Sequence, residues 1–306
     1  MSLDTRVAGQ RKRRTRFTPH LLIVPSVGII VLALGYPIVW QLVTSFQHFG
    51  LRQQFGQPAD FAGFENYARL VTDPELWAVI VRSIAFCVVT AVVTMVIGVL
   101  LALLMNVVTK PVRIVIQVAM LLAWAMPVVA AMTVWTWLFN WRRGVVNWLL
   151  TSAGLDFENH NWLIEPLSFY VVAMIIIVWM SVPFVAFSVF AGLTQVSGEV
   201  IEASEMDGAT GWQRFWNIIV PMVRPVLAIV LLLQLIWDLR VFTQIHILQD
   251  AGSIANQTHL LGTYIYMLGT GASDFGMASA VSIFILALTI ALSWFYVRSM
   301  LKEDES

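Results

Sequence analysis

Six long apolar segments limit this chain to very few folds, because each of them is long enough to cross a lipid bilayer. A helix needs about 20 apolar residues to do so, and 59% of the 306 residues are hydrophobic while only 12% are charged. A membrane β-barrel would show short segments of alternating polarity instead. The sequence therefore predicts an all-α integral membrane protein with six transmembrane helices. We place these helices near residues 20–46, 78–108, 112–140, 166–194, 222–248 and 276–298.

The distribution of Lys and Arg indicates how the six helices are oriented. With both termini in the cytoplasm, twelve Lys and Arg residues fall on the cytoplasmic side and five on the other, while Arg240 lies within a span. Cytoplasmic loops of membrane proteins carry the excess of positive charge. We therefore predict a multi-pass protein with a basic cytoplasmic segment at 1–19, a transmembrane domain at 20–298 and a cytoplasmic tail at 299–306.

The polar stretch between the fourth and fifth apolar segments is more ordered than a simple connection requires. Residues 199–207 are acidic and compatible with a helix, and Gly208 follows where a turn between two short helices needs a residue free in φ. Apolar residues then recur with the spacing of one helix face, at Trp212, Phe215, Trp216 and Ile219. We predict a cytoplasmic helix–turn–helix elbow over residues 199–221 that presents carboxylates to a partner. A surface-lying amphipathic connector without a partner is the alternative.

Several kinds of site are missing from the sequence. None of the three lysines follows a glycine, which excludes a Gly-Lys phosphate loop. The five histidines are scattered without a zinc-binding spacing, no Gly-x-Ser-x-Gly motif occurs, and Cys87 is the single cysteine. The formal net charge of zero gives no reason to expect nucleic-acid binding. We therefore expect no catalytic residues, no metal site, no bound cofactor and no nucleic-acid partner.

The elbow carries a recognisable signature. Glu202-Ala203-Ser204, then Gly208, then Ile218, Val220 and Pro221 stand in the register of the cytoplasmic loop of permease subunits in binding-protein-dependent ABC importers. That loop has Glu-Ala-Ala, three residues, Gly, nine residues and Ile-x-Leu-Pro. This chain departs from it at Ser204 and Val220, both of which are small changes. The stretch thus resembles the loop of such a permease.

The resemblance extends along nearly the whole chain and favours the carbohydrate-uptake branch of that family. Tyr36-Pro37, the run 61–67 (Phe-Ala-Gly-Phe-Glu-Asn-Tyr) and the run 274–280 (Asp-Phe-Gly-Met-Ala-Ser-Ala) are similar to its longer permease subunit, the type found in maltose and glycerol-phosphate permeases. The loop after the fifth span often reads Leu-Thr-x-Gly-Gly-Pro in this family. Here residues 248–252 read Leu-Gln-Asp-Ala-Gly, so the family does not predict a role for this loop.

The resemblance implies a type I ABC importer permease fold and a set of partners. Such a subunit lies in the inner membrane of a prokaryote and pairs with a second, homologous permease subunit. Two ATPase subunits, which hold the ATP and Mg, bind underneath. An extracytoplasmic solute-binding protein, which can be a lipoprotein, delivers a sugar, an oligosaccharide or a related solute for uptake by alternating access.

The resemblance also implies roles for elbow residues, because the elbow corresponds to the coupling helix that docks on an ATPase subunit. Glu202 is expected to make a charged contact there, with an arginine of the ATPase. Gly208 permits the turn, while Ala203 and Ala209 keep the docking face narrow. The remaining signature positions on this face are Ser204 and Asp207. For the flanking carboxylates Glu199 and Glu205 we expect simple solvation.

Polar residues within the fifth segment are candidates for contact with a transported solute. Gln234 and Asp238 are four residues apart and therefore share a helix face, with Trp237 and Phe242 beside them. Polar groups in a span are costly and usually face a cavity or a neighbouring helix. A carboxylate and an amide above an aromatic floor would suit sugar hydroxyls. The alternative is that Gln234 and Asp238 lock this helix to the partner subunit.

Three further residues inside the spans, one charged and two prolines, predict local features of the helices. Arg240 is only two residues from Asp238 and should point elsewhere. It either lines the upper cavity, where it would favour an anionic solute, or reaches to the outer interface, which we favour. Pro127 and Pro183 lie mid-span, where each is expected to kink or break a helix, as a hinge or as a static bend.

A stand-alone secondary solute carrier is the alternative function. A carrier of that kind predicts inverted repeats, broken helices at matching positions and ionisable residues for ion coupling. We find no convincing internal repeat, and the elbow would have no role in it. The sequence therefore favours the importer permease.

Overall fold

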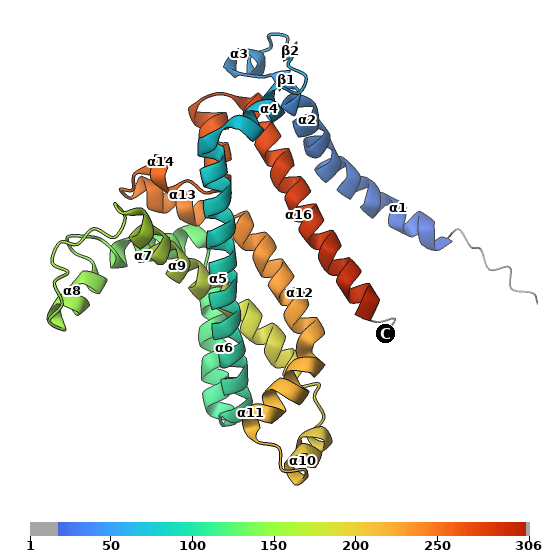
Figure 1. Cartoon of the computed structure of the whole chain (residues 1–306), viewed down its shortest axis with the longest axis vertical. Helices are drawn as coiled ribbons and strands as arrows, with labels where there is room; N and C mark the ends of the chain where they lie inside the picture. Colours follow the sequence, from blue (N-terminus) through green and yellow to red (C-terminus); the bar gives the residue numbers. More distant parts are fainter. Residues whose placement is uncertain (1–17, 304–306) are drawn as a thin grey trace, which may run out of the picture.

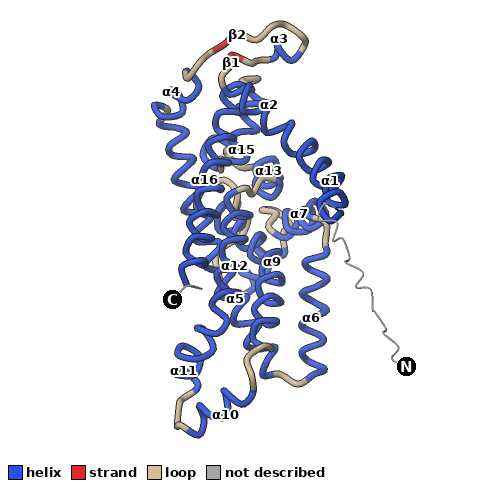
Figure 2. The backbone as a smooth tube through the Cα atoms, turned by 90° about the vertical axis from the view of Figure 1, so that its right-hand side faces the viewer, coloured by secondary structure: helices blue, strands red, loops and turns tan. Residues whose placement is uncertain are grey.

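The computed structural model describes residues 18–303. It is a long helical bundle, with α10 and α11 at one tip and a small hairpin, β1–α3–β2, at the other (Figures 1 and 2). The basic N-terminal segment up to residue 17 and the end of the tail, 304–306, lie outside the described residues. The predicted all-α membrane fold is confirmed.

The elements fall into two halves along the chain. The first half contains α1 (Thr18–Ile30), a π-helical turn η1 (Val31–Gly35), α2 (Tyr36–Ser45), β1 (Gln47–His48), α3 (Leu51–Gln54), β2 (Asp60–Phe61), α4 (Glu65–Thr72), α5 (Pro74–Val107), α6 (Lys110–Ala125), α7 (Val128–Leu138) and α8 (Val145–Ser152). The second half contains α9 (Pro166–Leu193), α10 (Gly198–Met206), α11 (Gly211–Arg214), η2 (Phe215–Ile219), α12 (Val220–Leu239), α13 (Thr243–Asp250), α14 (Ala255–Thr258), α15 (Leu261–Tyr266), η3 (Met267–Gly271) and α16 (Phe275–Glu303).

Within the described residues, 5 helical segments are long and apolar enough to cross a membrane, and a bent pair makes a sixth. The predicted span 112–140 is this pair, and the kink or break expected at Pro127 is found as a break between α6 and α7. The axes of α6 and α7 meet at 101°. The break falls at Met126-Pro127, because proline has no amide hydrogen to donate and disfavours a helical residue before it. Pro183, by contrast, lies inside an unbroken α9.

The predicted span 222–248 lies within one candidate span, Gly211–Asp250, but the helix inside it is interrupted, because α12 ends at Leu239 and α13 begins only at Thr243. The last bonds of α12 are of the tighter 3₁₀ type, from Arg240 N to Trp237 O (3.2 Å) and from Val241 N to Asp238 O (3.4 Å). Such bonds commonly close a helix.

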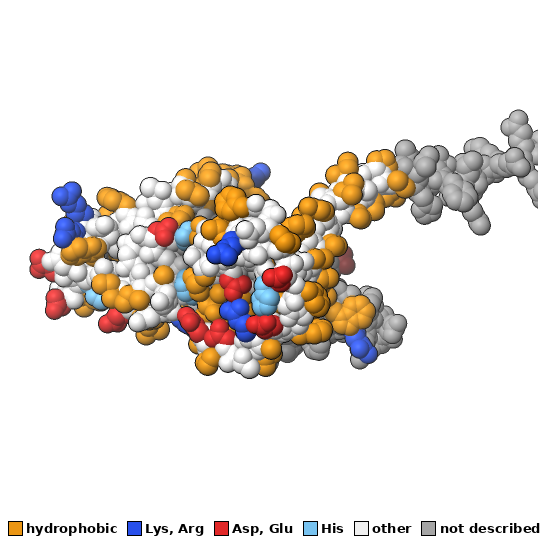
Figure 3. All heavy atoms as spheres, turned by 90° about the horizontal axis from the view of Figure 1, so that it is seen from above, with side chains coloured by type: hydrophobic (Ala, Val, Ile, Leu, Met, Phe, Trp, Pro, Cys, Tyr) orange, Lys and Arg blue, Asp and Glu red, His pale blue; other side chains and the backbone are white. Residues whose placement is uncertain are grey.

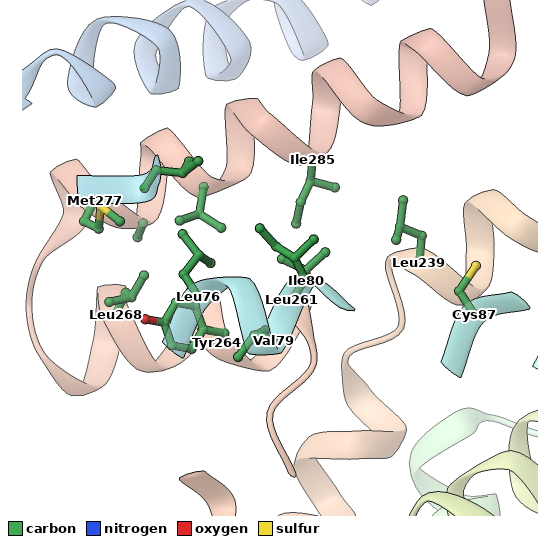
Figure 4. Close-up of a cluster of buried hydrophobic side chains, with 13 residues drawn as sticks. Leu76, Val79, Ile80, Cys87, Leu239, Leu261, Tyr264, Leu268, Met277 and Ile285 are labelled. Atoms are coloured by element: carbon green, nitrogen blue, oxygen red, sulfur yellow. The ribbon is translucent and has the colours of Figure 1, made fainter. Parts of the chain in front are cut away.

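One of the buried hydrophobic clusters lies where α5, α12, α15 and α16 meet near the hairpin end (Figure 4), and a second lies where α5, α7, α9 and α13 meet. Helix α5 begins at the first of these clusters with Pro74 in its first turn, and the Asp73 carboxylate accepts hydrogen bonds from Glu75 N (2.9 Å) and Leu76 N (3.4 Å). Leu76 and Val79 are then fully buried against Leu261 and Met277. Helix α5 also packs against α9 and α12 along its length.

The first span behaves differently from the others. Within the first span, Ile23–Ser45, no residue of the most apolar stretch is buried. Apolar side chains cover the surface of this span, which we call the arm (Figure 3). Helix α2 lies beside the start of α16 at the hairpin end, and the two helices diverge from there toward α1 (Figures 1 and 2). The arm is therefore held at one end only.

A polar clamp fixes that end, and we define it by Ser45, Gln47, Asn66 and Gly276. The Asn66 amide donates to Ser45 O (3.0 Å) and Gln47 O (3.1 Å), and Gly276 N donates to Phe49 O (3.1 Å). A Cβ atom on Gly276 would lie 2.3 Å from Gln47 O, so only glycine allows this approach. The clamp joins the two runs 61–67 and 274–280 that resembled a permease in sequence.

Candidate functional site

The elbow forms as the sequence predicts. Helix α10 covers Gly198–Met206, and Gly208 adopts φ +78°, a left-handed conformation that favours glycine. The amide of Ala209 then donates to Ser204 O (3.0 Å), which closes the turn. Five of the six predicted coupling residues are exposed or half-exposed, namely Glu202, Ala203, Asp207, Gly208 and Ala209. Ser204 is buried, and its hydroxyl donates to Ile201 O (2.6 Å).

The second helix of the elbow is started by a capping box. Gln213 N donates to the Thr210 hydroxyl (3.3 Å), and Thr210 N donates to the Gln213 side-chain carbonyl (2.8 Å). The next turn, η2, is π-helical, and Val220 N bonds back to Phe215 O. Pro221 cannot donate to Asn217 O, which explains why the α-helical ladder is interrupted here.

This π-turn corrects the predicted apolar face. The α-helical spacing from Trp212 to Ile219 does not hold over 215–219, since a π-turn advances the chain by a different angle. Trp212 and Trp216 are 72% and 50% exposed and lie edge to face, with ring centroids 5.7 Å apart. The elbow therefore presents two aromatic rings outward instead of burying a full stripe.

Glu205 is paired rather than merely solvated, which corrects the expectation for this residue. Its carboxylate forms an ion pair with Arg214, across the turn at Gly208. The Glu205 side chain is 57% exposed and that of Arg214 is 23% exposed. The pair links α10 to α11 directly, so it braces the two arms of the elbow.

Glu202 lines a cavity between the elbow and the ends of the long helices. The cavity has a volume of about 440 Å³ and contains Asn106 at the end of α5 and Thr194 after α9. Ile219 closes it from the start of the next span. A carboxylate in such a cavity can receive a basic side chain from outside the subunit. Asn106 and Thr194 had no signal in the sequence, because their proximity to Glu202 arises only from packing.

The predicted polar pair on α12 does form. The Gln234 amide donates to the Asp238 carboxylate (2.9 Å), and the two residues are 0% and 3% exposed. The remaining oxygen of each side chain has no hydrogen-bond partner among the described residues. Close by, the Cys87 thiol of α5 donates to Leu235 O (3.3 Å). The pair thus faces the interior of this subunit.

The two aromatic residues predicted beside that pair point elsewhere. Trp237 is 46% exposed and packs against Phe184 of α9, with ring centroids 4.9 Å apart. Phe242 follows the end of α12 and packs against Tyr266, at 5.3 Å. No common aromatic floor lies under Asp238 among the described residues. Phe184, which sequence reasoning missed, is the aromatic partner that Trp237 actually has.

A family model described as the binding-protein-dependent transport system inner membrane component matches residues 94–299. The diacetylchitobiose uptake system permease protein DasB of Streptomyces coelicolor is 37% identical over 294 residues, which cover 96% of this chain and 89% of that protein. The trehalose/maltose transport system permease protein MalF of Thermococcus litoralis is 28% identical, over 97% of this chain and 98% of that protein.

Solved structures agree with the fold. One is a bacterial alginate ABC transporter in complex with an alginate pentasaccharide-bound periplasmic protein, matched with a TM-score of 0.77 and 22% identity. The match covers 91% of this chain and 92% of that one. At this identity the likeness concerns the fold alone, and that fold is the type I importer permease. The chain therefore belongs to the family of binding-protein-dependent transport system inner membrane components: it is a permease subunit of an ABC importer, a transport component and not an enzyme.

Proposed function

We propose that this permease takes up a sugar, an oligosaccharide or a closely related solute by alternating access. The observation that carries this proposal is the 37% identity, over 96% of the chain, to a permease named for diacetylchitobiose uptake. Relatives named for sulfoquinovosyl glycerol and for trehalose and maltose support the same class. Glycosidic solutes of one to a few units are the chemistry common to these names.

The family supports a proposed assembly. This chain pairs with a second, homologous permease subunit, and two ATPase subunits that carry ATP and Mg bind below. An extracytoplasmic solute-binding protein delivers the solute from above. In this arrangement the elbow and both termini lie in the cytoplasm, the hairpin lies outside, and residues 20–298 form the transmembrane domain between the segments 1–19 and 299–306.

The elbow is the element that couples this subunit to an ATPase. Glu202 receives a basic side chain in the cavity beside Asn106 and Thr194, since that cavity offers a carboxylate and two neutral polar groups. Gly208 sets the angle between α10 and α11. The exposed Ala203, Asp207 and Ala209 complete the docking face, and the buried Ser204 attaches it to the subunit.

The solute path runs along the exposed side of α12. Trp237 faces it directly, and a half-exposed aromatic ring is well suited to stack on a sugar. Gln234 and Asp238 stand behind it, with one unpaired oxygen each, and Phe242 bounds the path where α12 ends. In this proposal Gln234 and Asp238 contact the solute once the helices rearrange during alternating access.

The test begins with the intact complex. A mild-detergent pull-down of the tagged chain should recover a second permease, an ATPase with a phosphate loop and a solute-binding protein, all identifiable by mass spectrometry. The purified binding protein is then screened against chito-oligosaccharides, maltose and trehalose, and the preferred solute is used for uptake into proteoliposomes. Recovery of the chain alone, in stable form, would contradict the proposed assembly.

Elbow variants test the coupling role separately. Glu202→Ala and Gly208→Pro should abolish uptake without abolishing ATP hydrolysis, because they disrupt the coupling contact. The subunit should insert normally, because neither residue packs in the core. Glu199→Ala, on the same helix, is the matched control and should transport normally. Normal uptake with normal stimulation of ATPase activity in either test variant would refute the assignment. Trp237→Ala should lower uptake without loosening the ATPase.

A further inference from the structure

The acidic residue Asp238 is buried inside the subunit by the helices of its own chain. It is 3% exposed, and Gln234, its partner on α12, is 0% exposed. Helices α5, α9 and α16 pack against α12. Since these helices belong to the same chain, the two residues are buried in the free subunit, and docking of a partner subunit can only add to this burial.

No cationic side chain pairs with Asp238 within residues 18–303. Among the neighbouring side chains of α5, the Cys87 thiol donates to Leu235 O (3.3 Å), and the Arg82 guanidinium donates to Gln257 O. Arg240, two residues along from Asp238, lines a cleft between α2 and α16. The other titratable side chains on the helices that pack against α12 are Glu75 of α5, Tyr170 of α9, and Tyr296, Arg298, Lys302 and Glu303 in the last part of α16.

The position of Asp238 along its helix also disfavours a negative charge. The residue lies in the last turn of α12, which ends at Leu239. Free carbonyl groups give this end of a helix a partial negative charge, which stabilises cations and therefore destabilises anions. A carboxylate that is buried in an apolar interior without a cation is so costly that the group takes up a proton instead.

The hydrogen bonds of the pair point to the same protonation state. Gln234 Nε2 donates to Asp238 Oδ1 (2.9 Å), whereas Gln234 Oε1 and Asp238 Oδ2 have no partner among the described residues. If Asp238 is ionised, both of these oxygens are acceptors and cannot bond to each other. If Oδ2 carries a proton, it becomes a donor, and Gln234 Oε1 is an acceptor on the amide that already bonds to Oδ1. The soft terminal torsions of both side chains permit this second bond.

We propose that Asp238 is a neutral carboxylic acid and that two hydrogen bonds join it to Gln234. Gln234 Nε2 donates to Asp238 Oδ1, and the protonated Asp238 Oδ2 donates to Gln234 Oε1, so that both orphaned oxygens are satisfied. The bearing of this pair on transport rests on the proposed function. When the helices rearrange, the pair offers the solute uncharged donors and acceptors, which favours an uncharged saccharide over a cationic one.

Infrared spectroscopy of the complex in nanodiscs tests the protonation directly, because a protonated carboxyl group has a carbonyl stretching band that a carboxylate lacks. The difference spectrum between wild type and Asp238→Asn should contain this band at neutral pH. Asp250→Asn, which changes a side chain that is 69% exposed, is the matched control and should leave the band in place. Absence of the band from the Asp238→Asn difference spectrum would overturn the proposal.

The melting temperature of the same complexes is a second test. Asparagine keeps a neutral donor and a neutral acceptor at this position, so Asp238→Asn should melt close to wild type. Asp238→Leu should melt at a lower temperature, because it leaves the buried Gln234 amide without its partner. A loss in Asp238→Asn as large as that in Asp238→Leu, or failure of the Asp238→Asn complex to assemble, would show that the position requires a charge.

The consequence for the solute is tested with the preferred solute of the binding protein and a derivative in which a protonated amine replaces one hydroxyl. After correction for the affinity of the isolated binding protein, uptake of the derivative should be at least about tenfold lower, because a cation gains no compensating charge in the span. Equal or greater uptake of the derivative would contradict an uncharged pair. Failure of the proposed function is distinguishable, since in that case neither saccharide is taken up.

Discussion

The elbow at one tip of the molecule and the clamp near the other are both polar turns between membrane spans, yet they are held by different kinds of contact. The clamp joins residues far apart in sequence, such as Asn66 to Ser45, 21 residues away, and it is buried. The hydrogen bonds and the ion pair within the elbow span at most nine residues, and most of the elbow is exposed. The clamp thus belongs to the rigid body, whereas the elbow is a self-contained unit attached to it.

This difference has a mechanical consequence. A turn that carries its own bracing can be pushed as one piece by a partner without first being unfolded, as a coupling element requires. A turn built from long-range contacts resists such displacement and instead fixes the position of its neighbours. We therefore expect substitutions in the clamp to lower stability and substitutions in the elbow to change coupling.

Gly276→Ala should have the largest effect on stability. The added Cβ would lie 2.3 Å from Gln47 O and 3.1 Å from the Asn66 amide nitrogen, and a backbone oxygen cannot move aside cheaply. We expect a destabilisation at or above the about 1–3 kcal/mol typical of overpacking. The measurement is thermal stability of the detergent-solubilised complex. Gly269→Ala, where the nearest atom is 3.6 Å away, is the control and should change little.

Asn66→Ala should have the next largest effect. The side chain is 2% exposed and donates to two backbone carbonyls, which would both lose their partner. We expect a loss of about 1–3 kcal/mol in the same assay. Asn217→Ala, an exposed asparagine of the elbow, should leave stability unchanged. Equal losses in both variants would remove the proposed difference between the two ends.

The hairpin end should also respond to pH through His259. Burial, and secondly the charge of Arg82, lower the pKa of this histidine below its ordinary value of 6.5. Gln249 and Thr263 contact its ring nitrogen at 3.4 and 3.3 Å, and Tyr264 packs edge-on. The folded state therefore favours the neutral ring, so stability is full above pH about 6.5 and declines as the pH falls toward the lowered value.

The measurement is the melting temperature of the complex between pH 7.5 and pH 5, values that bracket the ordinary histidine pKa of about 6.5. His259→Gln should flatten the decline because it removes the titrating group. His48→Gln, at an exposed position, should retain it. A decline that is the same in all three proteins would place the pH response elsewhere.

The Glu205–Arg214 pair should have the smallest effect on stability, at most about 1 kcal/mol, because the Glu205 carboxylate is 57% exposed and water screens the pair. Its expected effect is on coupling. Glu205→Gln should raise the number of ATP molecules hydrolysed per solute transported, and Glu205→Arg combined with Arg214→Glu should restore the ratio. Elevated salt should reduce the difference between these proteins. Failure of the reversed pair to restore coupling would show that the brace has no such role.

How much the sequence predicts depends on the range of the contacts involved. The positions of the long apolar segments, the helix at 199–207 and the turn at Gly208 were all predictable, because composition and local spacing determine them. A kink or break at Pro127 was predictable from the proline itself, but the bend of 101° between α6 and α7 was not. The ion pair of Glu205 could not be inferred, since nothing in the sequence relates it to Arg214 across the turn.

The sequence by itself determined that this protein is a helical membrane permease, because bilayer length, charge asymmetry and the elbow signature are all local properties. The tertiary structure alone decided which polar groups face inward and which face outward. Spacing predicted that Gln234 and Asp238 share a face, but only packing turned that face toward Cys87 and left Trp237 exposed. It likewise placed Arg240 in a cleft between two spans that are far apart in the chain.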